Sequence, residues 1–180
     1  IQIGTEGRFR GIHFGVIGRI QLKYEAGLWN EWHLLFDDGR SAWLSEAGGE
    51  YVVSALVPVS ETLPAFESLE PEMLVKIGGK DFAVTDLETA HCIGGQGELP
   101  FKVESGYDVN TADLRGNDRF VTLDYSETPP LVFVGYPAKF DELNLANLKE
   151  APSPVTGGQA TVKADAFNCP HCAAPLTVHS

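Results

Sequence analysis

Between residues 29 and 46, apolar and polar side chains alternate with the period of two that is typical of β-strands. The alternation is interrupted at Asp38-Gly39, a pair that supplies the positive φ angles of a two-residue type I′ turn. The pattern therefore predicts a β-hairpin. A two-residue turn at this point places Leu34 directly opposite Trp43.

This register divides the predicted hairpin into two faces, because successive side chains of a strand point to opposite sides. The apolar face carries Trp32, Leu34, Phe36 and Trp43. The other face is mostly polar and carries Glu31, His33, Leu35, Leu44 and Glu46, with Trp29 on the same side by alternation. We expect the first face to enter the core, with Trp43 buried on it, and the second to face solvent.

The rest of the chain shows further short strand patterns separated by turn residues. Strands are expected within 12–24, 51–59, 101–103, 120–125 and 131–136, with a second hairpin at 73–87. Residues 61–72 form a proline-punctuated connector with room for one helical turn, and 91–100 are expected to form a glycine-rich loop. Convincing long helices are absent from the pattern. The predicted fold is mainly β, a small barrel or sandwich-like arrangement of antiparallel sheets.

Composition and charge narrow the classes of partner. Apolar residues make up 43% of the 180-residue chain, which is ordinary for a globular protein, and the formal net charge is −12. Nucleic acid needs clustered Lys and Arg, so it is not an expected partner. The longest apolar run, 51–59, is too short for a transmembrane segment. Three cysteines, two of them in Cys-x-x-Cys, suit a reducing compartment, and we expect a cytoplasmic protein.

The strongest candidate site is Cys169-Pro-His-Cys172, whose two thiolates have the spacing of a zinc knuckle. His179 is a candidate third ligand. Two cysteines form only half of a zinc ribbon, so structural zinc is expected only in a complete chain that supplies the remaining ligands. A redox pair is the alternative, but it lacks the βαβ context that such pairs occupy. The expected organisation is a β-rich domain at 3–150, a linker at 151–163 and the first half of a zinc ribbon at 164–180.

Other polar residues are weaker candidates for a functional site. Glu31, His33 and Glu46 would share one hairpin face, where they could hold a metal or serve as acid and base; the alternative is a solvated surface. His91 and Cys92 are adjacent on a strand, so they point apart and Cys92 is expected to be a buried structural residue. The glycines of 94–97 lack the Lys and Ser/Thr of a phosphate-binding loop, which favours a flexible loop. Three further acids show no sequence partner: Glu98, Asp113 and Asp124.

Three stretches together resemble the bacterial domain-of-unknown-function family numbered 4178. They are Gly15-Val-Ile-Gly-Arg-Ile20, the hairpin from Trp29 to Glu46, and Gly97-Glu-Leu-Pro100 followed by Ala112-Asp113. The resemblance covers about residues 3–150 and implies a bacterial intracellular accessory protein, with a link to envelope-stress or membrane-associated assemblies. Zinc ribbons often adjoin this domain in the family, in keeping with Cys169 and Cys172. It implies no catalytic residues.

The expected function is a non-catalytic binding or scaffold module. Its exposed strands and Trp-rich hairpin would contact another protein, and self-association as a homo-oligomer is left open. The alternative is a metal-dependent hydrolase that uses Glu31, His33 and Glu46. A bound metal or a deep pocket on that hairpin face would favour the enzyme, whereas a flat exposed edge would favour the binding module.

Overall fold

Ten strands form one antiparallel sheet in the computed structural model, which describes residues 1–25, 27–47, 49–103, 106–150, 167–168 and 175–176. The strands are β1 (Glu6–Phe9), β2 (Ile12–Tyr24), β3 (Gly27–Phe36), β4 (Ser41–Ala47), β5 (Glu50–Leu56), β6 (Leu74–Ile77), β7 (Lys80–Gly97), β8 (Tyr107–Arg115), β9 (Phe120–Asp124) and β10 (Leu131–Ala138). Two single turns of 3-10 helix accompany them, η1 (Phe66–Ser68) and η2 (Phe140–Leu143). The prediction of a mainly β fold is confirmed.

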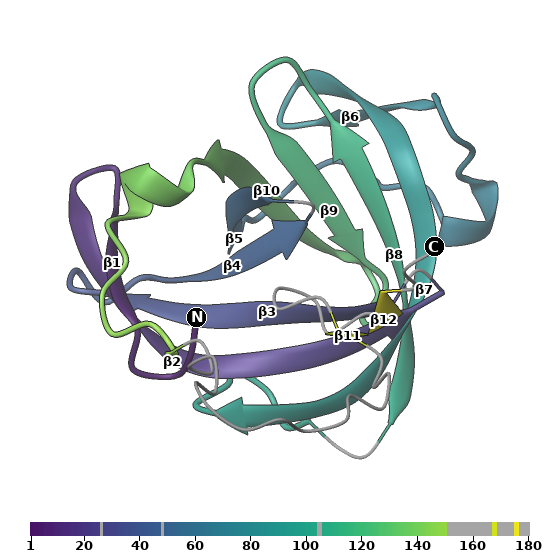
Figure 1. Cartoon of the computed structure of the whole chain (residues 1–180). Helices are drawn as coiled ribbons and strands as arrows, with labels where there is room; N and C mark the ends of the chain where they lie inside the picture. Colours follow the sequence, from purple (N-terminus) through teal and green to yellow (C-terminus); the bar gives the residue numbers. More distant parts are fainter. Residues whose placement is uncertain (26, 48, 104–105, 151–166, 169–174, 177–180) are drawn as a thin grey trace.

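The sheet closes into a barrel because β2 pairs with β7 as well as with β3 (Figure 1). The closing ladder runs from Gly18 opposite Gly97 to Lys23 opposite His91. The closed ring contains eight strands in the order β2-β3-β4-β5-β10-β9-β8-β7. The short strands β1 and β6 lie outside this ring, each paired with one neighbour through a hairpin.

A bulge in β2 reverses which side chains face the barrel interior. The register against β3 shifts between Val16 and Gly18, so Val16 pairs with Leu34 whereas Gly18 pairs with His33. One extra residue at this point moves the even-numbered side chains of β2 from the outer face to the inner face. The first half of β2 therefore packs outward, and Ile20 points inward.

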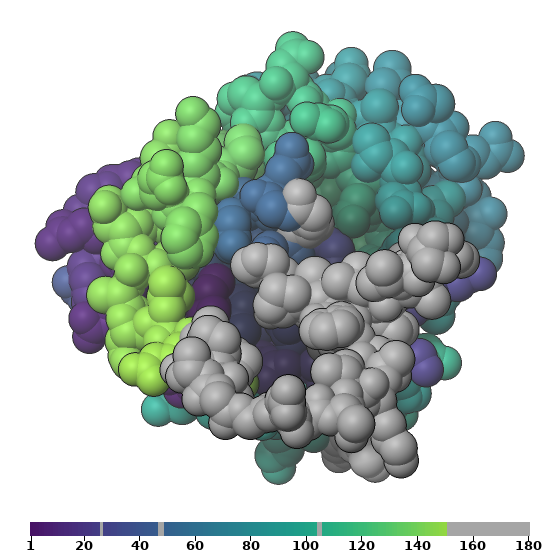
Figure 2. Space-filling view, viewed as in Figure 1, coloured from purple at the N-terminus to yellow at the C-terminus, as the bar shows by residue number. Residues whose placement is uncertain are grey.

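Two apolar clusters lie on the outer face of the barrel, each under a separate cover. The first is built on β2 to β5 and contains Phe14, Val16, Trp32, Leu34, Phe36, Ala42, Leu44, Tyr51, Val53, Ala138 and Leu143. Its cover is β1 together with η2 and the residues after it, which return to β1 through a bridge between Glu6 and Ala146. In Figure 2 this last segment, in lime, lies against the purple N-terminal hairpin.

The second outer cluster lies over β7 to β10. Its buried members are Leu69, Val75, Ile77, Phe82, Val84, Ala112, Leu114, Val121, Leu123 and Val132. The strand β6 and the connector that contains η1 cover it, with Leu63 and Phe66 packed against the cluster. The one helical turn expected between 61 and 72 is confirmed by η1, and the hairpin expected at 73–87 by β6 and the start of β7.

The predicted register of the β3–β4 hairpin is wrong by one residue. Leu34 pairs with Ala42, and Trp43 pairs with His33. The loop has three residues rather than two: the Phe36 N–H donates to the Arg40 carbonyl at 2.8 Å, and only Gly39 in the loop has positive φ. The Asp38 carboxylate instead accepts the Arg40 N–H at 3.1 Å, which stabilises a turn of this length without a positive φ at Asp38.

Three other strand assignments need correction. Residues 91–97 of the glycine-rich loop expected at 91–100 are the end of β7, paired with β2. The strand expected at 101–103 is part of the connection between β7 and β8. β8 itself, at Tyr107–Arg115, was not expected from the sequence.

The C-terminal predictions lie mostly outside the described residues. The structure shows a short pair of strands, β11 (Phe167–Asn168) and β12 (Pro175–Leu176). The linker at 151–163 and both knuckle cysteines, Cys169 and Cys172, are outside the described part of the chain, and so is His179. Across the residues that are described, no helix has the length and apolar character needed to cross a membrane.

Candidate functional site

The barrel interior brings together side chains from strands that are not neighbours in the sheet. Ile20 of β2, Trp43 of β4 and Cys92 of β7 form one buried cluster, and Phe133 of β10 and Tyr107 of β8 pack against it. Such contacts between non-adjacent strands can form only on the inner face. Trp43 is therefore buried as predicted, but inside the barrel rather than on the face of Trp32 and Leu34.

The connection after β7 enters this interior. Its residues Leu99 and Val103 pack against the inner cluster, and the Phe101 ring stacks on Trp43 with centroids 6.1 Å apart. Glycine makes the approach possible: a Cβ on Gly18 would lie 2.2 Å from the Glu98 carbonyl oxygen. Only a residue without a side chain allows this close backbone contact.

His33 lies at the centre of these contacts and is 6% exposed. Its Nδ1 is 2.9 Å from the Glu98 carbonyl oxygen, which can only accept, so Nδ1 carries the proton of that hydrogen bond. In the neutral ring Nε2 is then an acceptor. This atom is buried and has no hydrogen-bond partner among the described residues.

Acidic side chains line the same inner face beyond His33. Alternation and register place Glu31 on β3 opposite Ser45, Asp113 on β8 opposite Thr122, and Asp124 on β9 opposite Thr111. Thr111 lies between two acids, because Glu88 of the neighbouring strand β7 also pairs with it. The Thr122 hydroxyl donates to Asp113 at 2.6 Å. Asp113 remains solvent-accessible, which shows that solvent reaches this part of the interior.

Burial and neighbouring negative charge raise the pKa of several of these acids. Burial, and after it the charges of Asp113 and Asp124, together raise the pKa of Glu31 to about 7. Burial also raises the pKa of Asp113 and of Glu88. The pKa of Tyr24 is raised by burial and then by the charge of Glu31. All of these shifts favour the protonated form and mark a site with excess negative charge.

Trp29 completes the inner face of β3. Its ring packs edge-on against Tyr24, with centroids 5.9 Å apart. Its indole Nε1 is buried and lacks a hydrogen-bond partner among the described residues. The alternating residues Trp29, Glu31 and His33 thus present an unpaired donor, a carboxylate and an unpaired acceptor to one interior.

The structure does not bring Glu46 to Glu31 and His33. Because Glu31 pairs with Ser45, Glu46 points to the outer face, where it lies opposite Tyr51. Burial and the nearby charge of Glu46 raise the pKa of Tyr51 to about 12. Glu31 and His33 do share a face, but that face lines the barrel and is not the solvated surface that we expected. No three His, Cys, Asp or Glu side chains in the described ranges are arranged to hold a metal ion.

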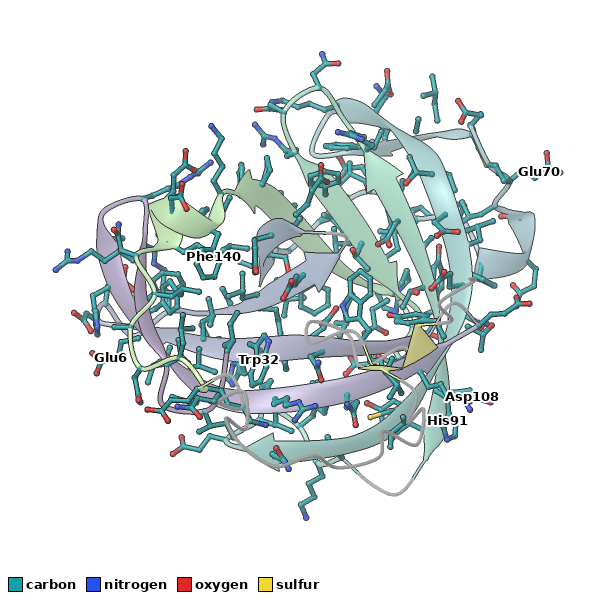
Figure 3. The ribbon with its side chains drawn as sticks, in the orientation of Figure 1. Glu6, Trp32, Glu70, His91, Asp108 and Phe140 are labelled. Carbon is teal, nitrogen blue, oxygen red and sulfur yellow. The ribbon has the colours of Figure 1, made fainter. Side chains whose placement is uncertain are left out.

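His91 and Cys92 point to opposite sides, as predicted. Cys92 is fully buried in the interior. His91 lies on the outside, where its Nδ1 is 2.7 Å from a carboxylate oxygen of Asp108 (Figure 3). The position of Asp113 and Asp124 beside Glu31 was not expected from the sequence. The available signal was the repeated spacing of Thr111 with Asp113 and of Thr122 with Asp124.

A separate apolar groove lies on the surface where β5 ends and β10 begins. Its volume is about 420 Å³. The lining residues are Leu56, Val57, Pro58, Val59, Glu61, Leu63, Glu127, Pro129, Pro130, Leu131 and Val132. Leu56 is 57% exposed; among the described residues Leu74 of β6, at 65%, is a more exposed large apolar side chain.

Comparison with known proteins gives a family but no activity. No curated protein and no solved structure matches the chain significantly. A family described as a domain of unknown function, DUF4178, matches residues 2–139. The match includes all strands from β1 to β10 and ends just before η2. The chain therefore belongs to the DUF4178 family.

Proposed function

We propose that this protein is a non-catalytic binding module that recognises an extended segment of a partner protein in the groove between residues 56–63 and 127–132. The observation that carries the proposal is the apolar lining of this groove next to the exposed Leu56. Exposed apolar surface of this kind is a common feature of protein contact sites.

Charge defines the partner segment more closely. Glu61 and Glu127 belong to the groove lining, and the chain carries a formal net charge of −12. Opposite charge across an interface increases the rate and the specificity of association. The expected occupant is therefore an extended peptide segment in which apolar residues alternate with Lys or Arg.

The Trp-rich hairpin is not the surface that we now favour. Trp32 and Trp43 are each 8% exposed, so they stabilise the fold rather than contact a partner. The hydrolase alternative gains no support from the register, because Glu46 lies on the opposite face from Glu31 and His33. It stays a prediction.

Two sequence-based expectations remain part of the proposal. Cys169 and Cys172 bind structural zinc when two further ligands complete the tetrahedral site. The expected compartment is the cytoplasm, because an odd number of cysteines with two of them in Cys-x-x-Cys suits reducing conditions.

Selection of peptides from a random displayed library against the full chain tests the proposed function. We expect enriched peptides with alternating apolar and basic residues. Their affinity should fall at least tenfold in a Leu56→Asp variant, because the substitution places a charge on the apolar wall. Leu74→Asp is the matched control, since Leu74 is 65% exposed on β6 and lies outside the groove.

The two variants distinguish binding in the groove from a general effect of charge. Peptides that bind the parent and Leu74→Asp equally, but not Leu56→Asp, support the groove. An absence of enriched peptides contradicts the proposal. Equal loss of binding in both variants also contradicts it, because it would show that general charge and not the groove determines binding.

A further inference from the structure

We propose that the inner face of β3 is a binding site for a small organic amine that carries a hydroxyl or ether oxygen near its ammonium group. The residues that would hold it are Trp29, Glu31 and His33. This inference is independent of the proposed function, because none of these three residues lines the groove.

The first argument is the pattern of unpaired hydrogen-bonding atoms. Two buried side-chain atoms lack a partner within the described residues, Trp29 Nε1 and His33 Nε2, and they belong to the two inward-facing neighbours of Glu31. Unpaired buried polar atoms are rare in folded proteins because each costs about 1–3 kcal/mol. Their concentration around one carboxylate indicates that a ligand provides the missing hydrogen bonds.

The chemistry of these atoms defines the ligand. Trp29 Nε1–H is a donor and requires an acceptor oxygen. His33 Nε2 is an acceptor, because Nδ1 already donates to the Glu98 carbonyl, and the Glu31 carboxylate also accepts. The ligand must therefore bring at least two N–H or O–H donors and one oxygen acceptor, which an amine with a nearby oxygen does.

The surrounding charge selects a cation over a neutral molecule. Asp113 and Asp124 lie near enough to Glu31 to destabilise its charge, and among the described residues no Lys or Arg forms an ion pair with Glu31. A cation within this ring of carboxylates would relieve their mutual repulsion. Its ammonium group could also lie against the aromatic rings of Trp29 and Tyr24.

Size and access are compatible with such a ligand. At about 3.3 Å per residue, Glu31 lies roughly 7 Å along β3 from Trp29 and from His33, so an ammonium group at Glu31 and an oxygen a few bonds away can also reach one of these neighbours. Solvent reaches Asp113 on the same inner face. A small amine therefore has a route to the acidic end of the interior.

The test uses the full chain and two probes of the same shape. The first is 2-(2-aminoethoxy)ethanol, which is cationic at about pH 8. The second is diethylene glycol, in which a hydroxyl replaces the ammonium group. The readout is the indole N–H signal of Trp29 in a two-dimensional ¹H–¹⁵N NMR spectrum, assigned with a Trp29→Phe variant.

We expect the amine to shift the Trp29 signal in a saturable manner and the glycol to leave it in place. Glu31→Gln should weaken binding of the amine at least tenfold while the spectrum stays that of a folded protein. Glu70→Gln is the charge-matched control, because Glu70 is exposed on the outside (Figure 3). It should bind the amine as the parent does.

Three results would overturn the proposal. One is the absence of any shift of the Trp29 signal, which would mean that these atoms are satisfied by water alone. The second is an equal response to both probes, which would show that the positive charge is irrelevant. The third is equal affinity in the parent and in Glu31→Gln, because a specific site must depend on that carboxylate.

Discussion

His33 packs against Trp43 with ring centroids 4.8 Å apart, and the two residues are direct partners in the β3–β4 register. This pairing joins the buried aromatic cluster of the barrel to the loop after β7, since His33 also bonds to Glu98. It places Trp43 in the barrel interior, whereas Trp32 and Leu34 of the same hairpin pack into the outer cluster.

Truncation of Trp43 should be costly. We expect Trp43→Ala to lower the free energy of unfolding by about 3–5 kcal/mol, because a large ring that is 8% exposed would leave a cavity between His33 and Phe101. Urea denaturation measures the change. Leu35→Ala in the same hairpin is the control, since Leu35 is 42% exposed and should cost less than about 1 kcal/mol. A loss below about 1 kcal/mol for Trp43→Ala would contradict the assignment.

The sequence predicted the elements of this hairpin better than their register. Alternation correctly placed Trp32, Leu34 and Phe36 on one buried face. The error came from Asp38-Gly39, which is compatible with a two-residue or a three-residue loop. The side chain of Asp38 decides between them through its hydrogen bond to Arg40, and a shift of one residue moves Trp43 to the other face.

Other features depended on contacts that are distant in sequence. A closed barrel could be proposed from strand patterns, but the pairing of β2 with β7 joins residues more than 60 positions apart. Asp113 and Asp124 raise the pKa of Glu31 only because the fold brings β8 and β9 to face Glu31 across the interior. The glycines of 94–97 indicated a loop, whereas Gly95 is part of β7 and leaves room for Leu99 and Val103, which a Cβ at that position would meet at 2.5 and 2.9 Å.

Gly18 should not tolerate a side chain. A Cβ there would lie 2.2 Å from the Glu98 carbonyl, so Gly18→Ala must displace the loop and should cost about 1–3 kcal/mol. Gly15 on the same strand is the control, because a Cβ at that position meets no atom within 4 Å. Thermal and urea denaturation of both variants test this. Similar stability of the two variants would show that the loop does not enter the barrel as described.

Ionisation of Glu31 should destabilise the folded protein. Its pKa is raised from 4.5 to about 7, so between these values the folded state binds more protons than the unfolded state. Stability contributed by this residue is therefore lost as pH rises through the window. Relative to Glu31→Gln, the parent should lose about 1–3 kcal/mol between pH 5 and pH 8. Urea denaturation at several pH values measures this difference, and parallel pH profiles for the two proteins would contradict it.

Zinc binding should depend on ligands beyond the two knuckle cysteines. In a chain that supplies a second Cys-x-x-Cys, we expect one zinc per chain and loss of the metal in Cys169→Ser. A chelator should unfold the ribbon and leave the barrel melting transition unchanged. A stable disulfide between Cys169 and Cys172 in the cell, with no zinc in the longer chain, would favour the redox alternative.

A titration of the Glu31 carboxyl carbon, followed by ¹³C NMR, measures whether Glu31 faces Asp113 and Asp124 inside the barrel. We predict a pKa of about 7 for Glu31. Asp113→Asn or Asp124→Asn should each lower this pKa, because each removes a neighbouring negative charge. A pKa near 4.5 that neither substitution changes would contradict the account.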